Sequence, residues 1–208
     1  MGTRFLFVAT LLCVALLPGL AQAQDRMPPI APDQYSDEQK AAAAEFQAAR
    51  KAPVFGPFAA MMRSPEVMNR ARAMGDYLRY KSAIGNVLSE LAILITAREY
   101  SQIYEWSLHA PIAEKAGIKP EIVAAIADGR RPEAMSDDEA IVYDFSTELY
   151  HNKRVSDDTY ARALKRFGDR GVVDLISING YYTFLAMFLN TSRLPPAKGG
   201  PLLQRFPE

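Results

Sequence analysis

A carboxylate and an imidazole stand four residues apart in the segment Tyr104-Glu105-Trp106-Ser107-Leu108-His109. Residues i and i+4 share one face of a helix, so Glu105 and His109 lie side by side if this segment is helical. His109 is one of only two histidines in the chain, and histidine is the side chain that most readily exchanges a proton near neutral pH. The pair therefore indicates acid–base chemistry, with a solvated surface pair as the alternative.

The first 23 residues have the pattern of a secretory signal peptide. Arg4 precedes an almost wholly apolar run from Phe5 to Leu17, and Ala21-Gln22-Ala23 has the small-x-small pattern that signal peptidase reads. We expect cleavage after Ala23 and a periplasmic or secreted protein. The alternative is an uncleaved anchor, although the apolar run is shorter than the roughly 20 residues that a membrane-spanning helix needs.

The mature chain left by this cleavage has no thiol and almost no net charge. The only cysteine, Cys13, is lost with the peptide, and the loss of Arg4 reduces 24 basic residues to 23, against 24 acidic ones. Disulfides, cysteine nucleophiles and thiolate metal sites are therefore excluded from the mature chain. The near-neutral balance, with no basic block, predicts no binding to nucleic acid and none to a membrane after signal cleavage.

Helix and loop signals alternate along the rest of the chain, and no stretch shows the period-two alternation typical of strands. Capping boxes begin at Ser36 and Ser136. We expect an extended proline-rich leader over 24–35, a single all-α domain over 36–194 and an irregular tail over 195–208. The expected helices lie at about 36–50, 64–82, 86–116 with a break, 120–128, 136–150, 156–168 and 172–189.

The segment from Asn86 to Ala116 is helical in pattern but needs a turn. Its most polar point is Glu99-Tyr100-Ser101-Gln102. On one straight helix Glu90 and His109 would be about 28 Å apart, whereas a reversal at this polar point could bring Glu90 back beside Glu105 and His109. If the helix is instead continuous, Glu90 is structural or completes a site on a neighbouring subunit.

Several spaced segments of the mature chain form a recognisable set: Glu90-Leu91-Ala92-Ile93-Leu94, Tyr104-Glu105-Trp106-x-x-His109-Ala110, Ala116-Gly117-Ile118, Val172-Val173-Asp174-Leu175, Gly180-Tyr181-Tyr182 and Asn190. Together they resemble the carboxymuconolactone decarboxylase superfamily, and the resemblance covers most of the mature chain. The resemblance implies an all-α, single-domain, alkyl hydroperoxidase D-like helical bundle that assembles into a homo-oligomer, a trimer or hexamer. The last helix, apolar around much of its circumference with Phe184, Met187, Phe188 and Leu189, gives the oligomer physical support.

Alkyl hydroperoxidase D belongs to the same superfamily, and its pattern distinguishes two branches. That pattern has a glutamate, then cysteines twelve and fifteen residues later, and a histidine nineteen residues later. Counted from Glu90, these positions hold Gln102, Glu105 and His109. Thiol peroxidase activity is therefore not expected, because the sulfur nucleophiles are absent. The decarboxylase-like branch is the better match.

The resemblance implies a catalytic site made of His109, Glu105 and Glu90. The histidine would donate or accept a proton while a carboxylate orients its ring, and no cofactor is implied. Residues expected to bind substrate are Gln102, Tyr104, Trp106, Tyr181 and Tyr182, with core packing as the alternative for each aromatic side chain. We expect no metal, since Glu105 and His109 lack a third ligand at suitable spacing, and His151 is expected to cap a helix end.

Two classes of function follow from these residues. The first is a cofactor-independent acid–base enzyme of the decarboxylase or lyase type, acting on a small carboxylated or lactone-like organic compound. The second is a non-catalytic exported binding or assembly protein that retains the fold. Convergence of Glu90, Glu105 and His109 around a closed pocket would favour the enzyme.

Overall fold

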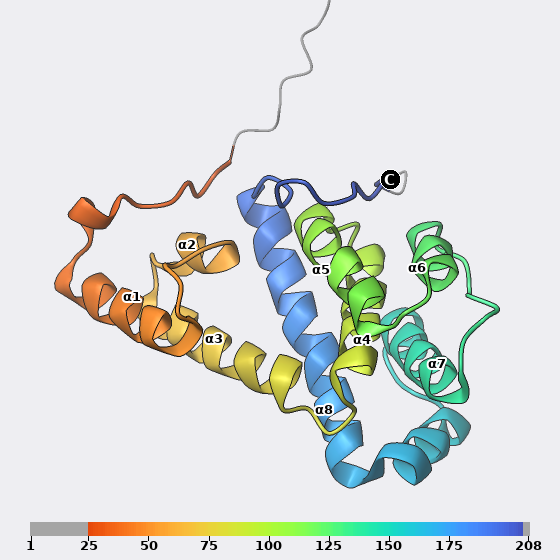
Figure 1. Ribbon diagram of the computed structural model, residues 1–208. Coiled ribbons are helices and arrows are strands. Elements are labelled where there is room, and N and C mark those ends of the chain that lie inside the picture. The colour runs from red at the N-terminus through yellow and green to blue at the C-terminus, as the bar shows by residue number, and fades with distance from the viewer. Residues whose placement is uncertain (1–24, 206–208) are drawn as a thin grey trace, which may run out of the picture.

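The computed structural model describes residues 25–205, and within that range the chain is all-α with no strand. This confirms the expected fold class. The signal peptide predicted for residues 1–23 lies outside the described residues and stays a prediction. A short 3-10 helix, Pro32–Gln34, precedes the main helices, which are α1 (Asp37–Arg50), α2 (Pro57–Met61), α3 (Pro65–Tyr80), α4 (Asn86–Glu99), α5 (Ile103–Ala116), α6 (Pro120–Ala127), α7 (Asp137–Asn152) and α8 (Asp157–Ser192) (Figure 1).

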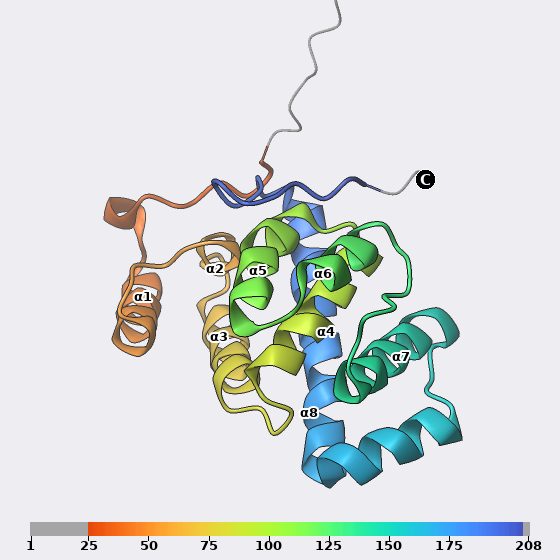
Figure 2. The same ribbon diagram turned by 45° about the vertical axis from the view of Figure 1, so that its right-hand side comes forward.

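Helix α4 is the centre of the bundle. Every residue from Leu88 to Arg98 is buried, as expected for a helix that is apolar on nearly all sides. α4 contacts α5, α7 and α8, and these surround it in both ribbon views (Figure 2). Glu90 is therefore carried on the least exposed helix of the described chain.

A tight turn separates α4 from α5 at the predicted polar point. Ser101 adopts a left-handed φ of 46°, and the side-chain oxygen of Gln102 accepts hydrogen bonds from the backbone N–H groups of Tyr104 and Glu105. These bonds satisfy two donors that a helix start leaves unpaired. The chain reverses here, so α5 runs back along α4 and the predicted break is confirmed.

Helix α8 is the longest element, and it bends where the sequence predicted a helix end. Gly168 has a non-helical φ of 68° that divides α8 into two parts. The part after the bend runs through the bundle beside α4 (Figure 1). α8 is long and apolar enough to cross a membrane by composition, but 56% of its apolar window is buried inside the protein. Burial to this extent is typical of a helix in the core of a protein.

The leader and the tail both lie across the end of the bundle at which α8 finishes (Figures 1 and 2). The backbone N–H of Arg26 donates to the carbonyl of Ser192 at 2.8 Å. In the tail, the backbone N–H of Ala197 donates to the hydroxyl of Ser107 at 2.9 Å. Apart from the 3-10 helix Pro32–Gln34, both segments are irregular, and both are tied to the domain by hydrogen bonds.

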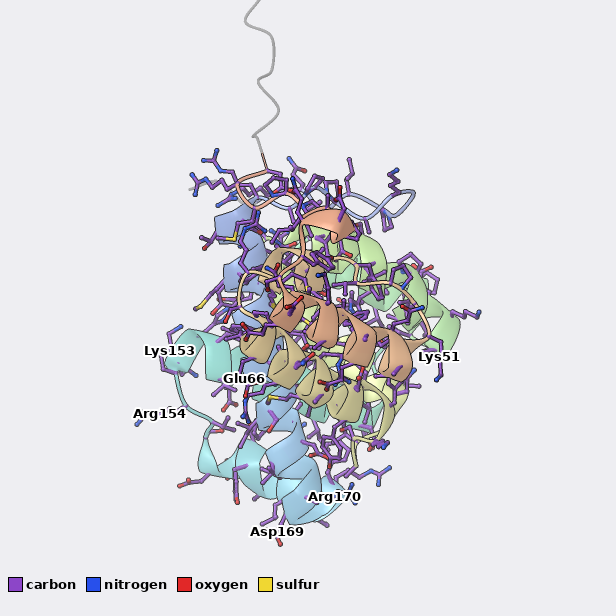
Figure 3. The ribbon with its side chains drawn as sticks, turned by 90° about the vertical axis from the view of Figure 1, so that its left-hand side faces the viewer. Lys51, Glu66, Lys153, Arg154, Asp169 and Arg170 are labelled. Carbon is purple, nitrogen blue, oxygen red and sulfur yellow. The ribbon has the colours of Figure 1, made fainter. Side chains whose placement is uncertain are left out.

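Helices α1, α2 and α3 form a layer on one side of α8. Figure 3 looks onto this layer, with Lys51 at the end of α1 and Glu66 near the start of α3. The first two residues of α2, Pro57 and Phe58, were expected to belong to a loop. Proline is favoured at the first position of a helix, and the buried Phe58 anchors the helix to the core, so the helix forms there. The layer meets α8 closely at Gly75, where an added Cβ would collide with the Tyr181 ring and hydroxyl.

Replacing Gly75 with alanine is expected to lower the free energy of unfolding by about 1–3 kcal/mol, because the methyl group overpacks the contact with Tyr181. Alanine in an open helical position would instead stabilise by about 0.5–1 kcal/mol. Urea unfolding measures the difference. The double variant Gly75→Ala/Tyr181→Phe removes the hydroxyl and should recover part of the loss relative to Tyr181→Phe alone. A Gly75→Ala protein as stable as the wild type would contradict this packing.

Candidate functional site

The α4–α5 reversal brings Glu90, Glu105 and His109 together within one chain. His109 Nδ1 lies 2.6 Å from Oε2 of Glu90, and His109 Nε2 lies 3.2 Å from Oε2 of Glu105. All three residues are 3% exposed or less. Glu105 and His109 are one turn apart on α5, as their spacing predicted, while Glu90 comes from α4.

Both ring nitrogens of His109 face carboxylate oxygens, and this determines how many protons are needed to make both contacts hydrogen bonds. A neutral imidazole has one N–H and one lone pair, so it can donate to only one of the two carboxylates. The other contact would then place a lone pair against a negative oxygen. The geometry is therefore satisfied when one further proton is held between His109, Glu90 and Glu105.

The electrostatics of the site place this proton on the histidine. Burial alone lowers the pKa of His109, but its hydrogen bonds to Glu105 and Glu90 and their negative charges outweigh the burial, so the pKa of His109 is raised above its ordinary 6.5. An imidazolium with two N–H groups donates to both carboxylates. The raised pKa of His109 favours this protonated form, which can give a proton to a ligand.

Arg79 on α3 supplies a second positive charge to this buried group. Its Nη2 lies 3.4 Å from Oε1 of Glu90, the oxygen that His109 does not contact. Burial opposes the charged form of Arg79, but Tyr182, Glu90 and Glu105 raise its pKa overall. Two carboxylates, one imidazolium and one guanidinium sum to zero, which is the condition under which buried charges are tolerated.

A small cavity of about 30 Å³ adjoins His109, and this volume holds one or two water molecules. Tyr182 packs edge-on against His109, with ring centroids 5.4 Å apart, and Tyr181 packs edge-on against Tyr182. Burial raises the pKa of Tyr104 to about 12 and that of Tyr182 well above its ordinary value. Their hydroxyls are therefore neutral hydrogen-bond donors. The cavity is lined by Arg50, Phe55, Pro57, Phe58, Gly75, Arg79, Tyr104, Glu105, Leu108, His109, Tyr181, Tyr182 and Leu185.

Two residues expected to bind substrate lie away from this cavity. Trp106 is 3% exposed and belongs to the apolar core. Gln102 caps α5, and its amide nitrogen donates to the side-chain oxygen of Asn190 at 2.9 Å. His151, expected to cap a helix end, instead places Nε2 3.1 Å from Glu99, while Lys153 donates to the carbonyl of Tyr150 at that end.

The layer formed by α1, α2 and α3 contributes cavity residues that the sequence did not indicate. Arg79 and Gly75 come from α3, Arg50 ends α1, and Phe55 and Phe58 lie in or beside α2. Their spacing in the sequence from Glu90 and His109 does not predict that they lie at the site, because only long-range packing brings them there.

Within residues 25–205 no group of three or more histidine, cysteine, aspartate or glutamate side chains is placed to hold a metal ion. Glu90, Glu105 and His109 face one another rather than a common central point, since each ring nitrogen already contacts one carboxylate. The chemistry available from these side chains is proton transfer and hydrogen bonding.

Comparison with known proteins reveals structural likeness without close sequence likeness. No protein-family model matches the sequence, and no curated protein matches it. A crystal structure of an uncharacterized peroxidase-related protein from Silicibacter sp. TM1040 has a TM-score of 0.70 and 14% identity, covering 86% of this chain and 96% of that one. A peroxidase-related protein from Ralstonia eutropha JMP134, described as an alkylhydroperoxidase AhpD core, has a TM-score of 0.67 and 16% identity, covering 83% and 92%.

A third similar structure belongs to a protein with a named reaction. The debrominase Bmp8, solved as a cysteine-to-alanine variant in complex with 2,3,4-tribromopyrrole, has a TM-score of 0.66 and 10% identity, covering 85% of this chain and 94% of that one. At these identities the likeness concerns the fold. The chain has the alkyl hydroperoxidase D-like helical fold, as the resemblance in its sequence implied.

The free energy of unfolding is expected to fall as pH rises through the raised pKa of His109. A pKa that is higher in the folded state means that the native protein holds the proton more tightly than the unfolded chain does. The stabilisation is complete below the unfolded value of about 6.5 and is lost above the folded value. Urea unfolding between about pH 6 and pH 9 measures it, with His109→Gln as reference. Equal pH dependence in the two proteins would contradict the shift.

Proposed function

We propose that this protein is a cofactor-independent acid–base enzyme of the decarboxylase or lyase type, acting on a small carboxylated or lactone-like organic compound. One observation supports it above the others: the buried His109 lies between two carboxylates and beside an aromatic cavity. General acid catalysis uses a proton held on a positioned side chain next to the place where a ligand binds.

The proposed step is a decarboxylation completed by proton delivery. The carbon–carbon bond to the carboxylate breaks, carbon dioxide leaves, and the electron pair passes into the conjugated carbonyl of the lactone. The His109 imidazolium then donates its proton to the carbon, and solvent restores that proton afterwards. Glu90 and Glu105 fix the ring orientation, and the neutral Tyr104 and Tyr182 hydroxyls can donate hydrogen bonds to the carbonyl oxygen as it gains charge.

The composition of the site disfavours thiol peroxidase chemistry, despite the peroxidase-related names of two similar structures. Cys13 is the only cysteine in the sequence and lies outside the described residues. Glu105, at the position of the second peroxidase cysteine, is buried against His109. A carboxylate there accepts the hydrogen bond of the histidine but cannot form the sulfenic acid that a thiol peroxidase needs.

The narrow cavity favours one second candidate, a non-catalytic binding protein. A volume of about 30 Å³ is far below the roughly 300–1,000 Å³ of ordinary ligand pockets. Any organic ligand must therefore displace part of the cavity wall. In the binding alternative, the charged group around His109 serves only to hold a ligand that is released unchanged.

A panel of carboxylated unsaturated lactones separates the two candidates. We expect one or more members to lose carbon dioxide and their conjugated absorbance in the presence of the protein. His109→Gln should reduce the rate by about 100-fold or more, since general acid catalysis contributes a factor of that order. The rate should also decrease as pH rises through the raised pKa of His109, because the acid form is then lost.

His151→Asn is the matched control, because His151 is exposed and does not line the cavity. It should keep the full rate. Binding of panel members without turnover would favour the non-catalytic candidate. Turnover that survives His109→Gln, or reduction of an organic hydroperoxide by the mature chain, would contradict the proposed mechanism.

The partner that we propose is a second copy of this chain, paired through α8. Of the apolar residues expected at an interface, Phe184 and Met187 are exposed, whereas Leu189 is buried and Phe188 is partly buried. The exposed residues form a stripe, and their spacing is symmetric about Gly180, with members seven and four residues before it and four and seven after it. The stripe consists of Val173, Ile176, Gly180, Phe184 and Met187.

This symmetry suits an antiparallel two-fold contact, in which each subunit presents the same patch. Ile176 would face Phe184 of the other copy, and the two Gly180 positions would meet at the axis. A Cβ at Gly180 would meet nothing within 4 Å, so the helices are free to approach closely there. A two-fold contact of this kind can make a dimer or join two trimers into the expected hexamer.

Sedimentation velocity tests the α8 contact. The wild-type chain should sediment as a dimer or a multiple of it, and Phe184→Glu should shift it to a smaller species, because two charges would be buried at the contact. Tyr160→Glu is the matched control, since Tyr160 is 44% exposed on α8 but lies before the bend and outside the stripe. A monomeric wild type, or equal dissociation by Tyr160→Glu, would contradict the contact.

A further inference from the structure

A surface hollow lies next to the His109 cavity, between the end of α1, the segment leading to α2 and the end of α3. Its volume is about 490 Å³, many times that of the cavity. Arg50, Phe55 and Arg79 line both spaces, so these three side chains form the wall between them. The hollow is lined by Ala49, Arg50, Phe55, Asp76, Arg79, Tyr80 and Lys81.

The hollow carries more positive than negative charge. Arg50, Arg79 and Lys81 line it, against the single carboxylate of Asp76. That carboxylate is already shared, since it lies 2.9 Å from a nitrogen of Arg50 and 2.9 Å from Arg72. A net positive charge remains on the wall even when Arg79 is counted with the neutral set around His109, because Arg50 and Lys81 face the single carboxylate of Asp76. This charge attracts anions from solution.

The guanidinium of Arg79, which lines both the cavity and the hollow, has a hydrogen-bond donor without an acceptor within residues 25–205. Nη2 is directed to Glu90 at 3.4 Å, whereas the buried Nε has no hydrogen-bond acceptor among the described residues. A buried donor without an acceptor is destabilising, and a bound acceptor would remove that cost. The guanidinium fork matches the two oxygens of a carboxylate in spacing and charge.

We propose that this hollow is the entrance of the site, and that Arg79, with Arg50 beside it, binds the carboxylate of the anionic ligand. The inference rests on the proposed function only in taking that ligand to be the substrate. Because Arg79 also contacts Glu90, a carboxylate held there lies next to the side chains that hold the proton. Arg79 is thus a specificity-determining residue for acids over neutral compounds.

Phe55 and Arg50 control the passage from the hollow to the cavity. Phe55 is 42% exposed and packs edge-on against Phe46, with ring centroids 5.6 Å apart. The Arg50 guanidinium lies over the Phe58 ring at 4.5 Å and is held by Asp76. An incoming carboxylate competes with Asp76 for Arg50, and that competition loosens the wall where the ligand must pass.

Calorimetric titration with benzoate and with benzamide tests the charge requirement in the wild-type protein. The two probes share ring and shape and differ in the carboxylate. Benzoate should bind about ten-fold or more tightly than benzamide, since charge-assisted hydrogen bonds to Arg79 exist only for the acid. Equal affinity, or no benzoate binding at all, would overturn the proposal without any variant being needed.

Variants then assign the binding to Arg79. Arg79→Gln should reduce benzoate affinity to the benzamide level, and Arg79→Lys, which keeps the charge but loses the fork, should give an intermediate value. Arg70→Gln is the matched control, because Arg70 lies on α3 as well but is 80% exposed and paired with Glu66. If Arg79→Gln fails to fold, Arg79→Lys and Arg50→Gln test the assignment instead, and each should bind benzoate more weakly than the wild type. Full affinity in both would overturn the assignment.

His109→Gln separates this inference from the proposed chemistry. It should keep benzoate binding, because the anion contacts Arg79 and not the imidazole. Retained binding with lost turnover supports both ideas. Lactone turnover by the wild-type protein with no preference for benzoate over benzamide overturns the anion site alone. Benzoate binding to a wild-type protein that turns over no lactone overturns the proposed reaction alone.

Discussion

The hydrogen bond between His109 and Glu90 is the contact on which the rest of the structure depends. It joins α4 to α5 at 2.6 Å in a place where both side chains are almost fully buried. Burying a charge costs several kcal/mol unless a partner compensates it, so His109, Glu90, Glu105 and Arg79 are stable there only as a neutral set. The charge of each member is compensated by its neighbours in the set, so removing one side chain would leave an unpaired charge in the core.

The fold supplies what this neutral set requires. The turn capped by Gln102 aligns α5 with α4, which places Glu90 opposite the face that carries Glu105 and His109. α8 contributes the edge-on Tyr182, and α3 brings in Arg79. The layer of α1, α2 and α3 then closes the cavity and leaves the positive hollow outside it. The same contacts thus serve stability and hold the proton, while helices α1, α2 and α3 supply the outer wall of the cavity.

Local signals in the sequence were sufficient for the centre of the site. Capping boxes, the polar break after α4 and the i, i+4 spacing of Glu105 and His109 act over a few residues, and each of these elements forms as predicted. Trp106 follows Glu105 directly, so it points about 100° away around the helix and enters the core. Gln102 lies at the helix start, where its side chain is used by the backbone. Arg79 could not be predicted, because its place beside Glu90 depends on how a separate layer packs.

The most direct measurement of the central claim is the protonation of the His109 ring in solution. Nitrogen-15 NMR of the His151→Asn protein observes the single remaining histidine of residues 25–205. At about pH 6.5, the ordinary histidine pKa, an unshifted ring is half protonated, whereas the His109 ring should be mostly protonated and give mainly the signals of an imidazolium. A neutral ring at that pH, with one nitrogen unprotonated, would contradict a proton held by His109 between Glu90 and Glu105.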